Sequence, residues 1–112
     1  MLLRARCGLV VLVLVWLLMG CAQARAPHVT IAWETANEIG TAGFVIERGE
    51  TRAGPFTRIS TLIPAGDDPF VRHEYEYVDR DVAAGRIYHY QLVGITNRNE
   101  RNIAGQLSAE AK

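Results

Sequence analysis

Residues 87–96, IYHYQLVGIT, constrain the fold most, because apolar and polar side chains alternate along them. In an extended strand Tyr88, Tyr90 and Leu92 would point to one face and His89 to the other. Further short stretches have a similar pattern, and clusters of Gly, Pro, Asn and Asp separate them. No stretch keeps a period of 3.6 residues, so we predict an all-β chain. The expected strands are residues 28–33, 43–48, 56–63, 74–78, 87–96 and 103–111.

Six or seven short strands at this spacing are typical of two antiparallel sheets packed face to face. The alternation within each strand then assigns its inward face. Ser60 falls on the exposed face of its expected strand. The large aromatic side chains expected in the core are Trp33, Phe44, Tyr77, Tyr88 and Tyr90.

The first 20 residues have the three-part pattern of a secretory signal. Arg4 and Arg6 precede the apolar run 9–19, LVVLVLVWLLM, and small residues follow it. A membrane-spanning helix needs about 20 apolar residues. This shorter run is therefore expected to be a removable leader rather than a permanent span.

Residues 18–21, Leu-Met-Gly-Cys, resemble the lipobox of bacterial lipoproteins. The resemblance implies cleavage between Gly20 and Cys21, a diacylglycerol thioether on Cys21 and an acylated amino terminus. Several acyl chains would anchor the protein stably. Ala22, in place of Asp, resembles the class sorted to the outer membrane. The alternative is ordinary cleavage after Ala24, which fits the small-x-small pattern and would give a soluble exported protein.

On the lipoprotein reading the chain divides into a leader, 1–20, a tether, 21–27, and one domain, 28–112. An extended tether of this length reaches about 20 Å, so the domain would sit close to the bilayer. The two cysteines, Cys7 and Cys21, lie in or beside the leader. The domain is therefore expected to have neither a disulfide framework nor a thiolate metal site.

The charge balance argues against nucleic acid as a partner. From residue 21 onward there are 10 basic and 12 acidic residues. A nucleic-acid footprint would need clustered Lys and Arg on one face.

A W-x-T-A-x-E-x-x-x-x-G-F pattern is formed by Trp33, Thr35, Ala36, Glu38, Gly43 and Phe44. On this pattern the chain from about His28 to Lys112 resembles a bacterial fibronectin type III domain. The resemblance implies an immunoglobulin-like antiparallel sandwich of six to seven strands, used mostly for binding and spacing. Only about six residues separate Cys21 from the first clear strand, so the family's first strand is expected to be short or missing.

Val82 and Tyr88 have the spacing of the family's tyrosine corner. The resemblance implies that the Tyr88 hydroxyl bonds to the backbone upstream. Ala84 stands where the family often has Pro. Glu38 falls in the loop after the first expected strand, where we expect its carboxylate to fix the loop by accepting backbone hydrogen bonds.

No combination of residues indicates catalysis, a metal or a cofactor. The three histidines lack partners at metal-ligand spacing and are expected on the surface; they are His28, His73 and His89. Ser60 and Ser108 have no nucleophile-elbow context. Turn polarity explains the acidic pairs better than a calcium loop does; these are Asp67, Asp68, Asp79 and Asp81.

The sequence therefore predicts a non-enzymatic, lipid-anchored module that contacts another protein of the bacterial envelope through its loops or a sheet edge. Neither a nucleic acid nor a small-molecule substrate is expected. Two alternatives stay open: a module that binds glycan or cell wall, and an accessory subunit of an envelope enzyme. Glycan binding would need exposed aromatic side chains, and none is expected because the alternation places Trp33 and the tyrosines in the core.

Overall fold

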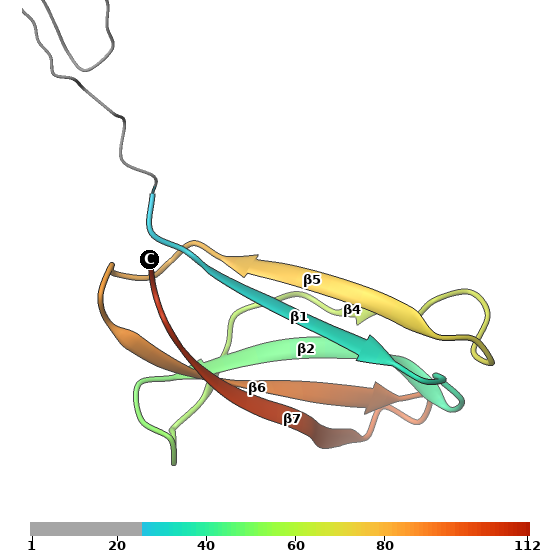
Figure 1. The fold of residues 1–112 in the computed structure, drawn as a ribbon. Helices are drawn as coiled ribbons and strands as arrows, with labels where there is room; N and C mark the ends of the chain where they lie inside the picture. The colour runs from blue at the N-terminus through green and yellow to red at the C-terminus, as the bar shows by residue number, and fades with distance from the viewer. Residues whose placement is uncertain (1–25) are drawn as a thin grey trace, which may run out of the picture.

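The computed structural model describes residues 26–112, so the expected leader and the expected lipidation and cleavage residues, Gly20 and Cys21, lie outside it. In the described range the chain forms seven β-strands and no helix (Figure 1). Every strand pair is antiparallel, and the strands form two sheets. The prediction of an all-β antiparallel sandwich of six to seven strands is confirmed.

The smaller sheet pairs β1 (Val29–Thr35) with β5 (His73–Asp79) over their whole lengths, from Val29 opposite Asp79 to Thr35 opposite His73. The predicted alternation is present in β1, where Val29 and Ile31 are buried and Thr30 and Ala32 are exposed. Within residues 26–112 no strand pairs with the other edge of β1.

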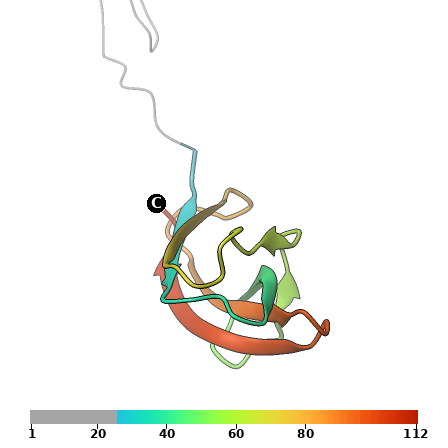
Figure 2. The same ribbon diagram turned by 90° about the vertical axis from the view of Figure 1, so that its right-hand side faces the viewer.

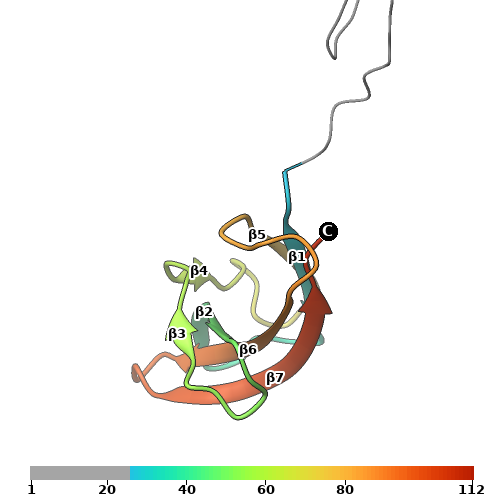
Figure 3. The ribbon, with the colours of Figure 1, turned by 90° about the vertical axis from the view of Figure 1, so that its left-hand side faces the viewer.

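The larger sheet has β2 (Thr41–Gly49) and β6 (Ile87–Thr96) at its centre and β7 (Arg101–Glu110) at one edge. Two short strands, β3 (Thr57–Arg58) and β4 (Ile63–Pro64), both pair with the other side of β2. The end-on views in Figure 2 and Figure 3 show the small sheet lying over the large one, with β7 curling toward β1.

The start of the domain and the end of β7 are joined. His28 and Lys112 exchange two backbone hydrogen bonds, of 3.2 and 3.3 Å. From this junction β1 and β7 run apart toward the opposite end of the domain (Figure 1). Among residues 26–112, this side of the sandwich is therefore closed only at the His28 end.

The prediction of one strand over residues 56–63 is wrong. Glu47 pairs with Arg58 and Phe44 with Ile63. Residues 58–63 therefore lie opposite the shorter segment 44–47, and the extra residues bulge away from β2. Ser60 fills the gap: it is buried rather than exposed, and its hydroxyl accepts a 2.8 Å hydrogen bond from the backbone nitrogen of Ile46. A side-chain oxygen here replaces the carbonyl that a regular ladder would supply.

The core lies between the two sheets. Strands β1, β2 and β6 supply most of it, and aromatic residues fill the end away from His28. There, Trp33 stacks on Tyr75 at a centroid distance of 5.3 Å, and Phe44 packs against both rings. The buried core cluster is Val29, Ile31, Ile46, Tyr88, Tyr90 and Ala111.

Candidate functional site

The aromatic residues expected in the core occupy different depths. Phe44, Tyr88 and Tyr90 are buried, whereas Trp33 and Tyr77 are half-buried against the core cluster. The Tyr88 hydroxyl accepts a 2.9 Å hydrogen bond from the backbone nitrogen of Ala83, five residues upstream. This bond holds the connection between β5 and β6 against the core.

Asp79 is not a polar turn residue. It ends β5 with only 4% of its surface exposed, and it accepts hydrogen bonds of 2.8 Å from both Arg48 and the Tyr90 hydroxyl. Burial, and then the adjacent Asp79, raise the pKa of Tyr90. Burial alone would lower the pKa of Arg48, but its bond to Asp79 raises it. Arg48 is therefore held in its charged form and Tyr90 in its protonated form, and both can donate hydrogen bonds to Asp79. The group ties the two sheets together.

Glu38 lies between the end of β1 and the start of β2, and its side chain is fully buried. Its carboxylate accepts hydrogen bonds from the backbone nitrogen of Gly66 at 2.7 Å, from the Thr35 hydroxyl at 3.0 Å and from the Tyr75 hydroxyl. Nδ1 of His73 lies 3.1 Å from a carboxylate oxygen, outside hydrogen-bonding geometry. Glu38 thus joins its own loop to the loop between β4 and β5.

The ionisation of this group follows from its contacts. Burial would raise the pKa of Glu38, but the hydrogen bonds from Tyr75, Gly66 and Thr35, with the nearby His73, hold the pKa below its ordinary value of 4.5. Burial, and then the Glu38 carboxylate, raise the pKa of Tyr75 to about 12. A charged carboxylate is therefore the stable form at neutral pH.

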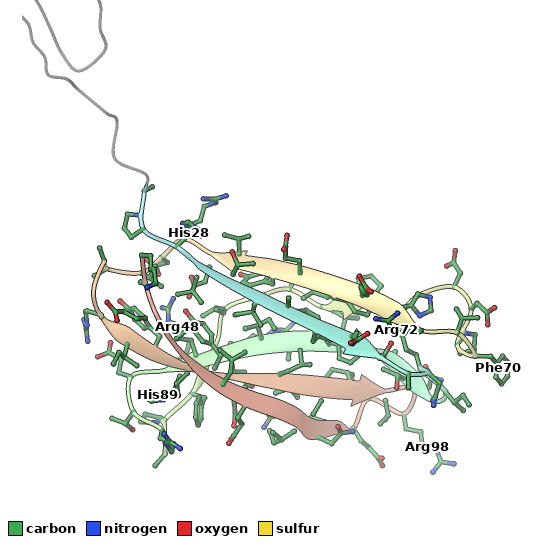
Figure 4. The ribbon with its side chains drawn as sticks, in the orientation of Figure 1. His28, Arg48, Phe70, Arg72, His89 and Arg98 are labelled. Carbon is green, nitrogen blue, oxygen red and sulfur yellow. The ribbon has the colours of Figure 1, made fainter. Side chains whose placement is uncertain are left out.

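The loops that Glu38 fixes carry exposed apolar side chains. The backbone nitrogen of Glu38 donates a 2.8 Å bond to Pro69 O, which places Ile39 and Phe70 on adjoining loops. Phe70 is 74% exposed and extends from the end of the domain opposite His28 (Figure 4). The expectation that no aromatic residue is exposed is thus wrong, because Phe70 lies in a turn, where strand alternation has no bearing.

The described residues contain no cluster of His, Cys, Asp and Glu able to hold a metal ion. Nor do residues 26–112 include an apolar helix of membrane-spanning length. His73 is not a surface residue as expected, since the Glu38 network half-buries it. His89 lies opposite Ser108, and its Nδ1 is 2.7 Å from the hydroxyl. This contact is an ordinary cross-strand pair, because no third described residue bonds to the histidine to orient it as a base.

A groove of about 250 Å³ runs along one side of the sandwich, between the edges of β1 and β7 that no other strand of residues 26–112 pairs with. Its walls come from residues 31–35 of β1 and 104–107 of β7, and inward-facing side chains of β2 and β6 form its floor. The large apolar members of its lining are Ile31, Trp33, Phe44, Ile46, Leu92 and Leu107.

The groove is an uncovered part of the core rather than a surface depression. Leu107 pairs with Tyr90 and so faces inward, yet it is 39% exposed. Gly105 pairs with Leu92, and a Cβ atom added to Gly105 would meet no atom within 4 Å. The indole nitrogen of Trp33, which also lines the groove, is buried without a hydrogen-bond partner among residues 26–112.

The wall formed by β1 is acidic. Glu34 lines the groove, and Glu74 and Glu76 project from β5 on the same exposed face of the small sheet. Arg72 is the basic residue that pairs with Glu34 and Glu74, and all three side chains are largely exposed. Net negative charge therefore lies beside the free edge of β1.

Comparison with curated proteins finds a partial relative. The chain is 28% identical over 86 residues to an amylopullulanase from Thermoanaerobacter thermohydrosulfuricus, a match that covers 76% of the chain. It spans only 5% of the length of that enzyme. No protein-family model matches the chain.

Proposed function

We propose that the protein is a non-enzymatic binding module, of the fibronectin type III kind, held at a bacterial membrane by lipid on Cys21. Its role is to contact another protein of the cell envelope. The observation that carries this proposal is the groove between β1 and β7, where core side chains and a strand edge lie uncovered. Soluble proteins seldom leave such an edge free, because it pairs readily with other chains.

The position of the groove supports a partner near the membrane. The tether enters at His28, where the sandwich is closed by the pair with Lys112. The groove begins a few residues further along β1, at Ile31, and runs along the side of the domain. Since the tether reaches only about 20 Å, the partner would lie in the membrane or just above it.

Cross-linking in intact cells followed by purification tests the proposal. The native chain should recover a specific envelope protein. Cys21→Ser should lose it if the anchor brings the two together. Gly105→Leu should also lose it, because Gly105 lines the groove, its added Cβ atom would meet no neighbour within 4 Å, and the rest of the leucine side chain would occupy space that the partner needs. Recovery of no envelope protein with the native chain would refute the proposed function.

A second candidate function is glycan binding at the Phe70 end of the domain. The match to part of an amylopullulanase, a glycan-degrading enzyme, favours it. So does the exposed ring of Phe70, which offers a stacking surface beside the acidic side chains of Asp67 and Asp68. The native protein should then pellet with cell-wall material or insoluble polysaccharide, and Phe70→Ala should not. If neither pellets, this candidate fails.

A further inference from the structure

We infer that the groove takes one extended segment of a partner protein, which pairs with the free edge of β1 and places alternate apolar side chains over the exposed core. This inference rests on the proposed function and names the part of the partner that is bound. The segment is further expected to carry Lys or Arg among its outward-facing side chains.

The backbone of β1 indicates a strand rather than a helix. All seven residues of β1 pair with β5 on one side, and no described residue pairs with the other side. Every second N–H and C=O of β1 therefore points toward the groove side. A helix satisfies its own backbone groups and would leave this row unpaired, whereas an added strand would bond to it.

The side chains lining the groove indicate alternating apolar residues. Leu107 and Trp33 face inward from opposite walls, and Gly105 leaves an unfilled space between them and the floor. In a strand every second side chain points to the same face. An inserted strand would therefore direct its apolar residues onto this floor, and its other side chains outward beside Thr30, Ala32 and Glu34.

The charges beside the groove favour a partner other than a second copy of this chain. Glu34 lines the groove, and the neighbouring strand β5 adds Glu74 and Glu76. Arg72 pairs with both Glu34 and Glu74, so the three carboxylates keep a net negative charge beside this edge. Cross-strand pairs of opposite charge are favourable, so an added strand with a basic side chain is favoured. β1 itself, VTIAWET, has no basic residue. In β7 the one basic side chain, Arg101, is already bonded to Glu47.

The tether of the same chain is also a poor occupant. Residues 21–25, Cys-Ala-Gln-Ala-Arg, contain no Val, Ile, Leu or aromatic residue to cover the floor. To reach the groove at Ile31, the chain would have to reverse before His28, which the pair with Lys112 holds in place. These two observations disfavour the tether, and we place the bound segment in another molecule.

Site-specific photo-cross-linking of the full chain in cells tests the inference. p-Benzoylphenylalanine is placed at Leu107, which faces the groove, and separately at Thr35 on the opposite wall. Because the Thr35 hydroxyl also bonds to Glu38, circular dichroism first checks that each variant is folded. The matched control is Ile103, on the same strand and 49% exposed, which pairs with Val93 and faces outward. Leu107 and Thr35 should give adducts with one partner, and Ile103 should give a yield lower by about tenfold or more.

Mapping of the adducts by mass spectrometry decides the identity of the occupant. The attachment points from Leu107 and Thr35 should fall in one short partner segment with alternating apolar residues and a nearby Lys or Arg. A synthetic peptide of that segment should block the adduct at Leu107, and a peptide with the same residues in shuffled order should not. Gly105→Leu should reduce the adduct at Thr35 by about tenfold.

Several results would overturn the inference. These are an adduct with twice the mass of the chain, a cross-link within the chain to residues 1–25, equal yields from Ile103 and Leu107, or attachment to scattered partner segments. If bulk cross-linking recovers an envelope partner but Leu107 and Thr35 give no adduct, the inference fails while the proposed function stands. If no partner is recovered by either method, both fail.

Discussion

The backbone nitrogen of Gly66 donates a 2.7 Å hydrogen bond to the carboxylate of Glu38, across 28 residues of sequence. Because Glu38 also bonds to Thr35 and Tyr75, one buried carboxylate fixes two loops and the end of the small sheet. Glu38→Ala would leave these donors unpaired. We expect it to lower the free energy of unfolding by about 2 to 3 kcal/mol, measured by urea denaturation.

Glu38→Gln is the matched control for that variant, since its amide oxygen can still accept from Gly66. It should lose less stability than Glu38→Ala. If both variants unfold at the same urea concentration as the native protein, the network does not hold the loops.

Stability should depend on pH through the same carboxylate. Folding lowers the pKa of Glu38 below 4.5, so the fold favours its ionised form. This contribution is complete above the ordinary pKa and is lost as the pH falls through the lower value of the folded state. Urea midpoints measured from pH 7 to about pH 3 should fall more steeply for the native protein than for Glu38→Gln. Parallel curves for the two proteins would refute this assignment.

The two aspartates next to Arg48 should differ sharply in their effect. Asp79 is buried and bonds to Arg48 at 2.8 Å, whereas the side chain of Asp81 is 96% exposed and 3.6 Å from the same guanidinium. Asp79→Asn leaves a largely buried arginine without its main partner and should cost about 3 kcal/mol. Asp81→Asn should change stability little, because an exposed ion pair is screened by water. Equal losses in thermal denaturation would contradict the assignment.

The Tyr88 hydroxyl should stabilise the fold through its hydrogen bond, separately from the packing of its ring in the core. Tyr88→Phe keeps the buried ring but removes the acceptor for Ala83 N–H. We expect a loss of about 1 kcal/mol. Calorimetry that finds no loss would mean that water satisfies the freed amide.

The sequence was sufficient to predict the sandwich because side chains alternate along several of its strands, including β1 and the first half of β6. In β6 this pattern assigned Tyr88 and Tyr90 to the core, where both are buried. Most turns were also clear from their Gly, Pro, Asn and Asp residues, whereas the break between β3 and β4 was missed. These signals depend only on residues near one another in the sequence, so they can be recognised without knowing which strands pair.

The errors arose where a contact joins distant residues. Ser60 is buried because Ile46, on another strand, needs a hydrogen-bond acceptor at a bulge. Asp79 is buried because Arg48 and Tyr90 converge on it from the other sheet. Neither requirement is visible in the residues that flank Ser60 or Asp79.

The groove was predictable only in part. The short segment between Cys21 and the first strand suggested a free sheet edge. The exposure of Leu107 and the empty space at Gly105 depend on how β7 diverges from β1, which no local pattern encodes. Phe70 was missed because a single aromatic residue in a turn has no periodicity to place it.

Amide hydrogen exchange along β1, measured by NMR on the purified mature protein, tests most directly whether the sandwich is open on this side. If β1 pairs only with β5, its amides should alternate between slow and fast exchange with a period of two, while those of the central strand β6 are slow throughout. Uniformly slow exchange along β1 would show that its outer edge is already paired, and the groove could not then accept a partner strand.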